Sequence, residues 1–130
     1  MLNRLIWVGM LAIIIVMAIQ FSDGLLERAG SLTATTKGVP DDAVLLEWRG
    51  EIAPPMESMI RKAYHEWGPK KRRIILSIHS PGGMLHHGDR VVKLLRQIAL
   101  THQLDTVVER NHTCASMCVP IYLQGETRLA

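Results

Sequence analysis

A serine between two cysteines is the part of the sequence best suited to covalent chemistry. Ser116 lies in the segment 111–118, between a predicted strand and a predicted helix, with Cys114 and Cys118 on either side. At a helix start, unpaired backbone N–H groups and the helix dipole stabilise negative charge, including an alkoxide or a tetrahedral oxyanion. A serine before a helix is also a common N-cap. Ser116 is therefore a candidate nucleophile whose residue type alone does not decide its role.

Two glycines form a second candidate group. Gly82 and Gly83 follow Ser80 and Pro81, after an apolar run at residues 74–78 that is typical of a parallel strand covered on both faces. Ligands gather at the carboxyl ends of such strands, and glycines there let bare backbone N–H groups point into a crevice. Ser-Pro-Gly-Gly is by itself an ordinary turn sequence. The two glycines are candidate donors of backbone N–H groups to a ligand.

The elements that must position both groups alternate between strand and helix. Apolar residues at helical spacing predict amphipathic helices over residues 56–67 and 91–102, and both stripes are interpreted as core packing. Shorter apolar runs predict three strands and a last helix, at residues 44–48, 74–78, 106–109 and 117–123. The order β-α-β-α-β-α predicts an α/β fold with a parallel sheet and right-handed crossovers.

In this order and spacing, the motifs resemble the Clp-type serine peptidase family. This is the branch of the ClpP/crotonase superfamily that includes the membrane-anchored signal peptide peptidase A and the NfeD-type proteases. The resemblance covers residues 44–130, and its motifs are Ser80-Pro81-Gly82-Gly83 after a strand and Cys114-Ala115-Ser116-Met117 before an apolar helix, with Arg128 following Gly125. It implies a ClpP/crotonase-like fold of repeated β-α units.

The resemblance also implies a site and an activity. Ser116 would be the nucleophile, and backbone N–H groups of Gly82 or Gly83 and of Met117 would form the oxyanion hole. The substrate would be a peptide or protein, no cofactor or metal is expected, and the relatives' rings and stacks imply a homo-oligomer. Two rival functions stay open. A crotonase-like acyl-thioester enzyme would use the same oxyanion hole, but Ser116 stands where a carboxylate is expected. A non-catalytic scaffold would keep the fold without a base.

The general base is missing from the sequence. The family activates its serine with a histidine about one β-α unit further on and an aspartate beyond it, or, in the signal-peptide-peptidase branch, with a lysine. The chain reaches Ala130, fourteen residues after Ser116, without either. We expect a partial domain truncated after the nucleophile helix. Four histidines could in principle reach the serine, although solvated or hydrogen-bonded side chains are the simpler interpretation. They are His79, His86, His87 and His112.

The cysteines and a proline depart from the family pattern. On a regular helix the Cα atoms of Cys114 and Cys118 would be about 6 Å apart, inside the disulfide range. An oxidising compartment favours a disulfide, two buried free thiols are the alternative, and a metal site would need His112 as a further ligand. Pro120 requires the helix to begin at about residues 116–118, because proline fits only the first turn.

The N-terminus carries a membrane signal. Residues 5–21 are almost entirely apolar, with Arg4 before them and Asp23 after them. Seventeen residues give a helix of about 25 Å, near the short end of what spans a bilayer. Arg4 should stay in the cytoplasm, which places the rest of the chain outside it. A cleaved signal sequence and a buried core helix are the alternatives. We therefore predict an anchor or signal sequence at 1–22, a flexible linker at 23–42, and the domain at 43–130.

Composition limits the other functions. The chain has 130 residues, 48% of them hydrophobic, and a formal net charge of +3. These values fit one modest globular domain and exclude a multi-span membrane protein, a collagen and a disulfide-dense miniprotein. The charge is too small to indicate nucleic-acid binding. The basic run Lys70-Lys71-Arg72-Arg73 is interpreted as a solvated turn.

Overall fold

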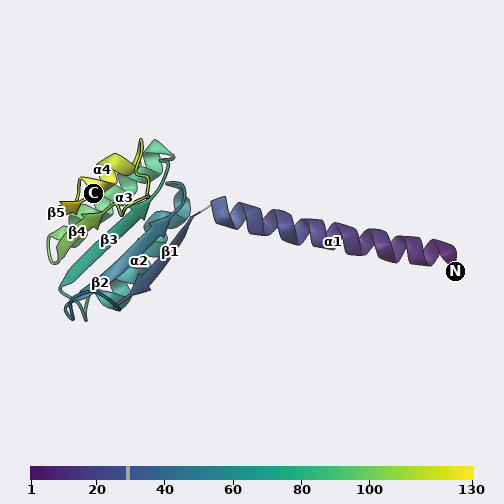
Figure 1. The fold of residues 1–130 in the computed structure, drawn as a ribbon, viewed down its shortest axis with the longest axis horizontal. Coiled ribbons are helices and arrows are strands. Elements are labelled where there is room, and N and C mark those ends of the chain that lie inside the picture. The colour runs from purple at the N-terminus through teal and green to yellow at the C-terminus, as the bar shows by residue number, and fades with distance from the viewer. Residues whose placement is uncertain (29) are drawn as a thin grey trace.

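A computed structural model describes the fold of residues 1–28 and 30–130, and the side chains of residues 1, 3–22 and 30–130. A long helix precedes a domain in which strands and helices alternate (Figure 1). The elements are α1 (Leu2–Arg28), β1 (Ser31–Thr35), β2 (Ala43–Arg49), α2 (Pro54–Trp67), β3 (Arg73–His79), α3 (Leu85–Ala99), β4 (Gln103–Val107), α4 (Cys118–Tyr122) and β5 (Thr127–Leu129).

The strands form a single sheet in the order β1-β2-β3-β4-β5. β2 to β5 are parallel, as predicted, and the register pairs Leu46 of β2 with Leu76 of β3. Each β-α unit therefore moves one strand further across the sheet. The third predicted strand, 106–109, is shifted, since β4 covers Gln103–Val107.

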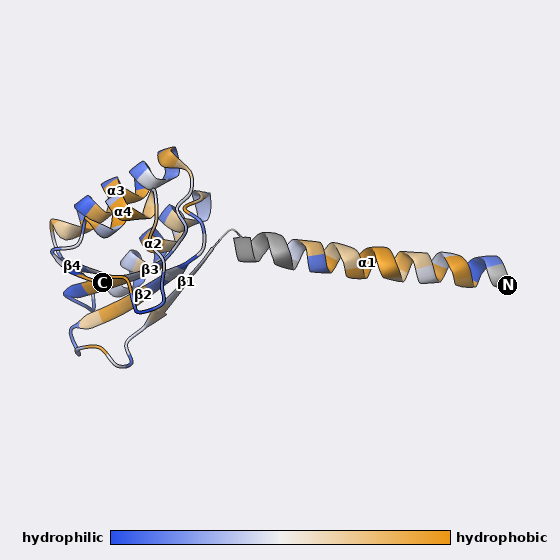
Figure 2. Ribbon diagram, turned by 45° about the horizontal axis from the view of Figure 1, so that its top comes forward, coloured by the Kyte–Doolittle hydropathy of each residue, from blue (hydrophilic) through white to orange (hydrophobic). Residues whose placement is uncertain are grey.

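The three domain helices, α2, α3 and α4, lie on one face of the sheet (Figure 2). Right-handed crossovers that always step in the same direction place every helix on the same side. The core between sheet and helices contains fully buried large side chains. They include Leu46, Trp48, Ile60, Ile78, Leu95 and Ile121.

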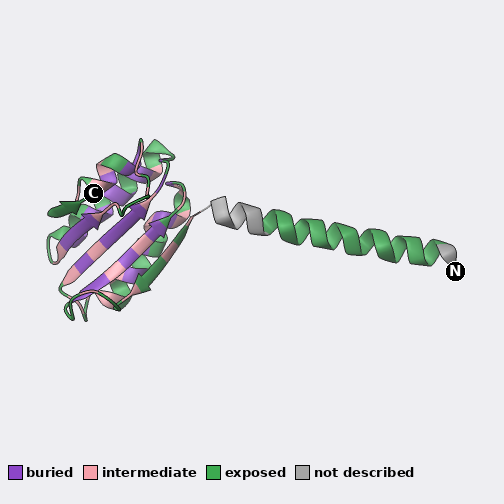
Figure 3. Ribbon diagram, in the orientation of Figure 1, coloured by how far each residue is buried: buried purple, intermediate pink, exposed green. Residues whose placement is uncertain are grey.

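The second face of the sheet lacks a helix layer in the described residues, which differs from the expectation that the strand at 74–78 is covered on both faces. Ile74 and Ile78 of β3 face the helices, whereas Ile75 and His79 alternate with them onto the open face. Figure 3 shows this alternation as buried and intermediate residues along β2 and β3. The helix side of β3 is entirely apolar, whereas its open side carries Ile75 together with polar residues.

The linker predicted at 23–42 is not a flexible tether over residues 31–35. Ser31–Thr35 is β1, which pairs antiparallel with β2 from Ser31 opposite Arg49 to Thr35 opposite Leu45. Gly30, with φ +83°, lies so close to Trp48 that a Cβ on it would come within 2.3 Å of the indole. The pairing satisfies the outer edge of β2, which would otherwise be exposed.

This antiparallel strand also decides where the chain joins the domain. Because Ser31 lies opposite Arg49, the start of β1 is at the carboxyl edge of the parallel strands. There a Cβ on Gly50 would lie 2.4 Å from Gly30 Cα, and the Gly50 N–H donates to the carbonyl oxygen of His79 at 3.0 Å. The N-terminal helix therefore leads into the carboxyl edge of the sheet.

The helix α1 is apolar along most of its length (Figure 2). Residues Asn3–Ser22 are long and apolar enough to cross a membrane, and none of them is buried. This exposure differs from the alternative in which residues 5–21 form a buried core helix. A membrane anchor and a signal sequence near the N-terminus meet the same criterion equally well.

One prediction tests the two faces of the sheet. Ile78→Ala removes a fully buried side chain and should lower the free energy of unfolding by about 2–5 kcal/mol. Ile75→Ala, three positions earlier on the open face, should cost only about 1 kcal/mol. Urea unfolding of the two variants measures both. Equal losses would show that another layer covers the open face.

Candidate active site around Ser116

The carboxyl ends of the strands bring the two candidate groups together. Beyond β3, Ser80 bridges to Cys114. The Ser80 N–H donates to the Thr113 carbonyl at 2.7 Å, and the Ala115 N–H donates to the Ser80 carbonyl at 3.2 Å. The segment before Ser116 thus continues the sheet alongside the segment before the two glycines.

The glycine loop is held from its other side by the segment after β2. Gly83 bridges to Ile52, whose N–H donates to the Gly82 carbonyl at 2.8 Å and whose carbonyl accepts the Met84 N–H at 2.9 Å. A Cβ on Gly83 would come within 2.3 Å of the Ile52 carbonyl oxygen. Glycine at 83 is therefore required by a backbone contact.

Gly82 and Ser116 lie directly against each other. A Cβ on Gly82 would be 2.8 Å from Ser116 Cβ and 3.3 Å from Ser116 Oγ. Gly82 also has φ +106°, in the region that favours glycine. Residues 82 and 116, which were identified as separate candidates from the sequence, are therefore in direct contact.

Ser116 itself has an unusual backbone. Its φ is +52°, one of two positive values among the non-glycine residues that the structure describes, and the residue is exposed. The turn that it forms leads into α4, where the Cys118 N–H donates to the Ala115 carbonyl and the Val119 N–H to the Ser116 carbonyl, both at 3.0 Å. Left-handed non-glycine residues concentrate at functional sites, where the surrounding structure enforces them.

The backbone N–H groups beside Ser116 differ in how they are used. The Gly82 N–H donates to Ser80 Oγ at 3.1 Å. Within the described part of the chain, the N–H groups of Gly83 and Met117 have no acceptor. Free N–H groups at a site are available to a ligand, so Gly83 and Met117 are better placed as donors than Gly82.

Cys114 and Cys118 form a disulfide, with Cα atoms 5.2 Å apart. Cys118 is fully buried, and Cys114 is partly buried and packs against the same core cluster. Pro120 is the third residue of α4, in the first turn where proline is tolerated.

Sequence reasoning assigned no supporting role to three residues that hold this site together. Ile52 and the buried Ser80 hold the glycine loop through the contacts described above. Gly88 lies within α3, where a Cβ would come within 2.2 Å of Met117 Cγ. A glycine inside a helical pattern signals such a close approach, whereas the role of Ile52 has no signal in its residue type.

The candidate histidines make other contacts. The Thr113 N–H donates to His79 Nδ1 at 2.8 Å, and the rings of His79 and His112 lie 4.8 Å apart. Arg49 Nη2 lies 3.2 Å from His112 Nε2. His86 and His87 lie in the first turn of α3, with ring centroids 5.7 Å apart. No hydrogen bond joins any of these rings to Ser116 among the described residues.

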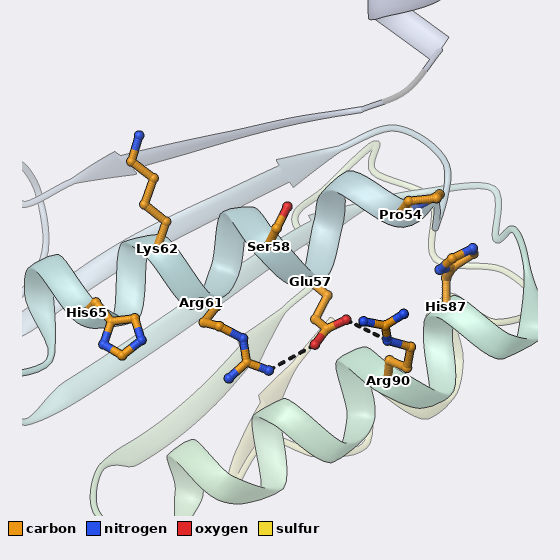
Figure 4. A pocket seen from close by; sticks show the side chains of 8 residues that line it. All are labelled: Pro54, Glu57, Ser58, Arg61, Lys62, His65, His87 and Arg90. Atoms are coloured by element: carbon orange, nitrogen blue, oxygen red, sulfur yellow. Dashed lines mark hydrogen bonds and ion pairs between the residues drawn. The ribbon is translucent and has the colours of Figure 1, made fainter.

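A groove of about 560 Å³ lies elsewhere, between α2 and α3 (Figure 4). Glu57 binds both Arg61 and Arg90 there, and the hydrogen bond from Arg61 is the main cause that lowers the pKa of the Glu57 carboxyl. Ser58, the hydroxyl in this groove, donates to the Pro55 carbonyl at 3.0 Å. The groove is a solvated ion-pair surface, and His87 is the one candidate residue among those that line it.

The contact between Gly82 and Ser116 predicts an effect on stability. Gly82→Ala should lower the free energy of unfolding by about 1–2 kcal/mol because of its left-handed backbone, and by a further ~1–3 kcal/mol because of the collision with Ser116. Gly38 is the matched control, since its φ is +74° and nothing lies within 4 Å of an added Cβ. Urea unfolding should show the larger loss for Gly82→Ala. Equal losses would contradict the close contact.

The fold resembles a solved structure. No family model matches the chain, and no curated protein sequence matches it. The ClpP1 N165D mutant from Listeria monocytogenes is similar in structure, with a TM-score of 0.55 and 24% sequence identity over 66% of this chain. The match covers 47% of the Listeria chain, so this chain spans about half of it. The domain has a ClpP-like fold.

Proposed function

We propose that this protein is a membrane-tethered serine peptidase with Ser116 as its nucleophile. The observation that carries the proposal is the position of Ser116, which is exposed, has a left-handed backbone, and lies against Gly82 at the carboxyl edge of the sheet. The ClpP-like fold and the family resemblance of the two motifs support the same function.

The proposed reaction is acyl transfer. Ser116 Oγ attacks the carbonyl carbon of a peptide bond, and the carbonyl electrons move to its oxygen. The Gly83 and Met117 N–H groups donate to that oxyanion. Preorganised donors of this kind usually make the largest single contribution to stabilising the transition state. A base must take the hydroxyl proton, and the described residues provide none hydrogen-bonded to Ser116. The 130-residue chain alone is therefore expected to show little or no peptidase activity.

A non-catalytic scaffold is the second candidate, and the lack of a hydrogen-bonded base among the described residues favours it. A crotonase-like acyl-thioester enzyme has no comparable support here. Chemical labelling of Ser116 distinguishes a peptidase from a scaffold.

The tether and the location are further parts of the proposal. α1 crosses the membrane with Arg4 on the cytoplasmic side, which places the domain on the periplasmic or extracellular side. Because the chain joins the domain at the carboxyl edge of the sheet, the proposed site lies at the edge nearest the tether. The family resemblance adds a homo-oligomer and peptide or protein substrates.

Labelling tests the nucleophile. The protein as its gene encodes it should react with a fluorophosphonate probe at Ser116, detected by mass spectrometry of the labelled peptide. Ser116→Ala should abolish the label at a stability cost of about 1 kcal/mol. Ser58→Ala, which changes a serine in the groove between α2 and α3, should leave it unchanged. A folded protein that escapes the probe would support the scaffold.

Fractionation tests the tether. The protein should remain in the membrane fraction after carbonate washing, because α1 buries an apolar span in the bilayer. Protease added outside the cytoplasmic membrane should remove residues 43–130. Release of a shortened soluble form would instead identify α1 as a cleaved signal sequence, and protection from the protease would reverse the topology.

A further inference from the structure

We propose that Cys114 and Cys118 are positioning residues, and that their disulfide makes the reactivity of Ser116 dependent on oxidation. This inference rests on the proposed function. The disulfide closes a ring of five residues with Ser116 at its centre. The two cysteines are bonded to each other, so they act on Ser116 through the backbone of this ring.

Each end of the ring is fixed to a different part of the domain. Cys114 bridges to Ser80, through the hydrogen bonds on either side of it. Cys118 begins α4 and is fully buried in the core cluster. The disulfide therefore connects the end of the sheet to the first turn of a packed helix, across Ala115, Ser116 and Met117.

This connection limits the conformations that Ser116 can adopt. Its φ of +52° is disfavoured for a residue with a Cβ, so an unconstrained segment would relax toward negative φ. With the disulfide closed, such a rotation would have to displace either the bridge at Ser80 or the buried start of α4. Met117, whose free N–H is a proposed oxyanion donor, lies inside the same ring and depends on the same constraint.

Opening the disulfide needs a reductant. A thiolate of dithiothreitol attacks one sulfur of the pair, the S–S bond breaks, and a mixed disulfide forms with one cysteine while the other leaves as a thiolate. The second thiol of the reagent then closes its own ring and releases the first cysteine. The protein gains two electrons and two protons, and dithiothreitol is oxidised. Cys114 is the less buried of the two cysteines and is the expected point of attack.

The test compares labelling rates of Ser116 in the full-length protein before and after dithiothreitol, well below the unfolding temperature. We expect the fluorophosphonate rate to fall at least tenfold on reduction and to return after reoxidation. The double variant Cys114→Ala/Cys118→Ala should be as slow as the reduced protein and insensitive to dithiothreitol, which controls for effects on the probe. A disulfide that contributes only stability would shift the melting temperature without changing the labelling rate of folded protein.

Equal rates for oxidised and reduced protein would overturn the inference. If neither form reacts with the probe, the proposed peptidase function fails. Amide hydrogen exchange then tests separately whether the disulfide positions the segment around Ser116. Reduction should then speed amide exchange in residues 113–119 while exchange in β3 and α3 stays unchanged. Unchanged exchange in residues 113–119 would overturn the inference as well.

Discussion

The site depends on a backbone contact that only glycine allows. Gly82 lies against Ser116, and Gly83 lies against Ile52, so the glycine loop is enclosed between two segments that follow different strands. A side chain at either glycine would separate these segments. The contact in turn requires Ser116 to be at the end of a segment that continues the sheet, which the bridge between Ser80 and Cys114 provides. The free N–H groups of Gly83 and Met117 follow from this arrangement.

The direction of the sheet explains why all of this gathers at one edge. Parallel strands end on the same side, so the segments after β2, β3 and β4 meet there. The helices, confined to one face by right-handed crossovers, support these segments from the core side through Met117 against Gly88. β1 runs in the opposite direction and brings the N-terminal helix to that edge. The position of the tether and the position of the site thus both follow from the topology of this sheet.

Much of this fold could be predicted from apolar patterns. β2, β3 and α2 are found where the apolar runs and stripes indicated, because their inward residues form the core. β1 could not be predicted in this way, since its residues are largely exposed and its stability comes from backbone pairing. The predicted strand at 106–109 began too late, because the polar Asp105 lies within β4. Asp105 faces the open side of the sheet, where Arg73 lies 3.4 Å away. The contact of Gly82 with Ser116 joins residues far apart in sequence, and only the family resemblance connected them.

The nearby histidines show why closeness to a serine does not make a base. A neutral imidazole has one nitrogen that can accept a proton, and a base must keep that nitrogen free. His79 uses Nδ1 to accept the Thr113 N–H. Arg49 can only donate, so Nε2 of His112 is the acceptor of that pair, and its Nδ1 is buried without a partner in the described residues. His79 and its register partner Arg49 lie on the open face of the sheet, since His79 alternates with the core-facing Ile78, and the His112 ring lies 4.8 Å from the His79 ring. These histidines therefore hold the loop that carries Ser116, and the lone pairs that catalysis would need are already used for that structural purpose.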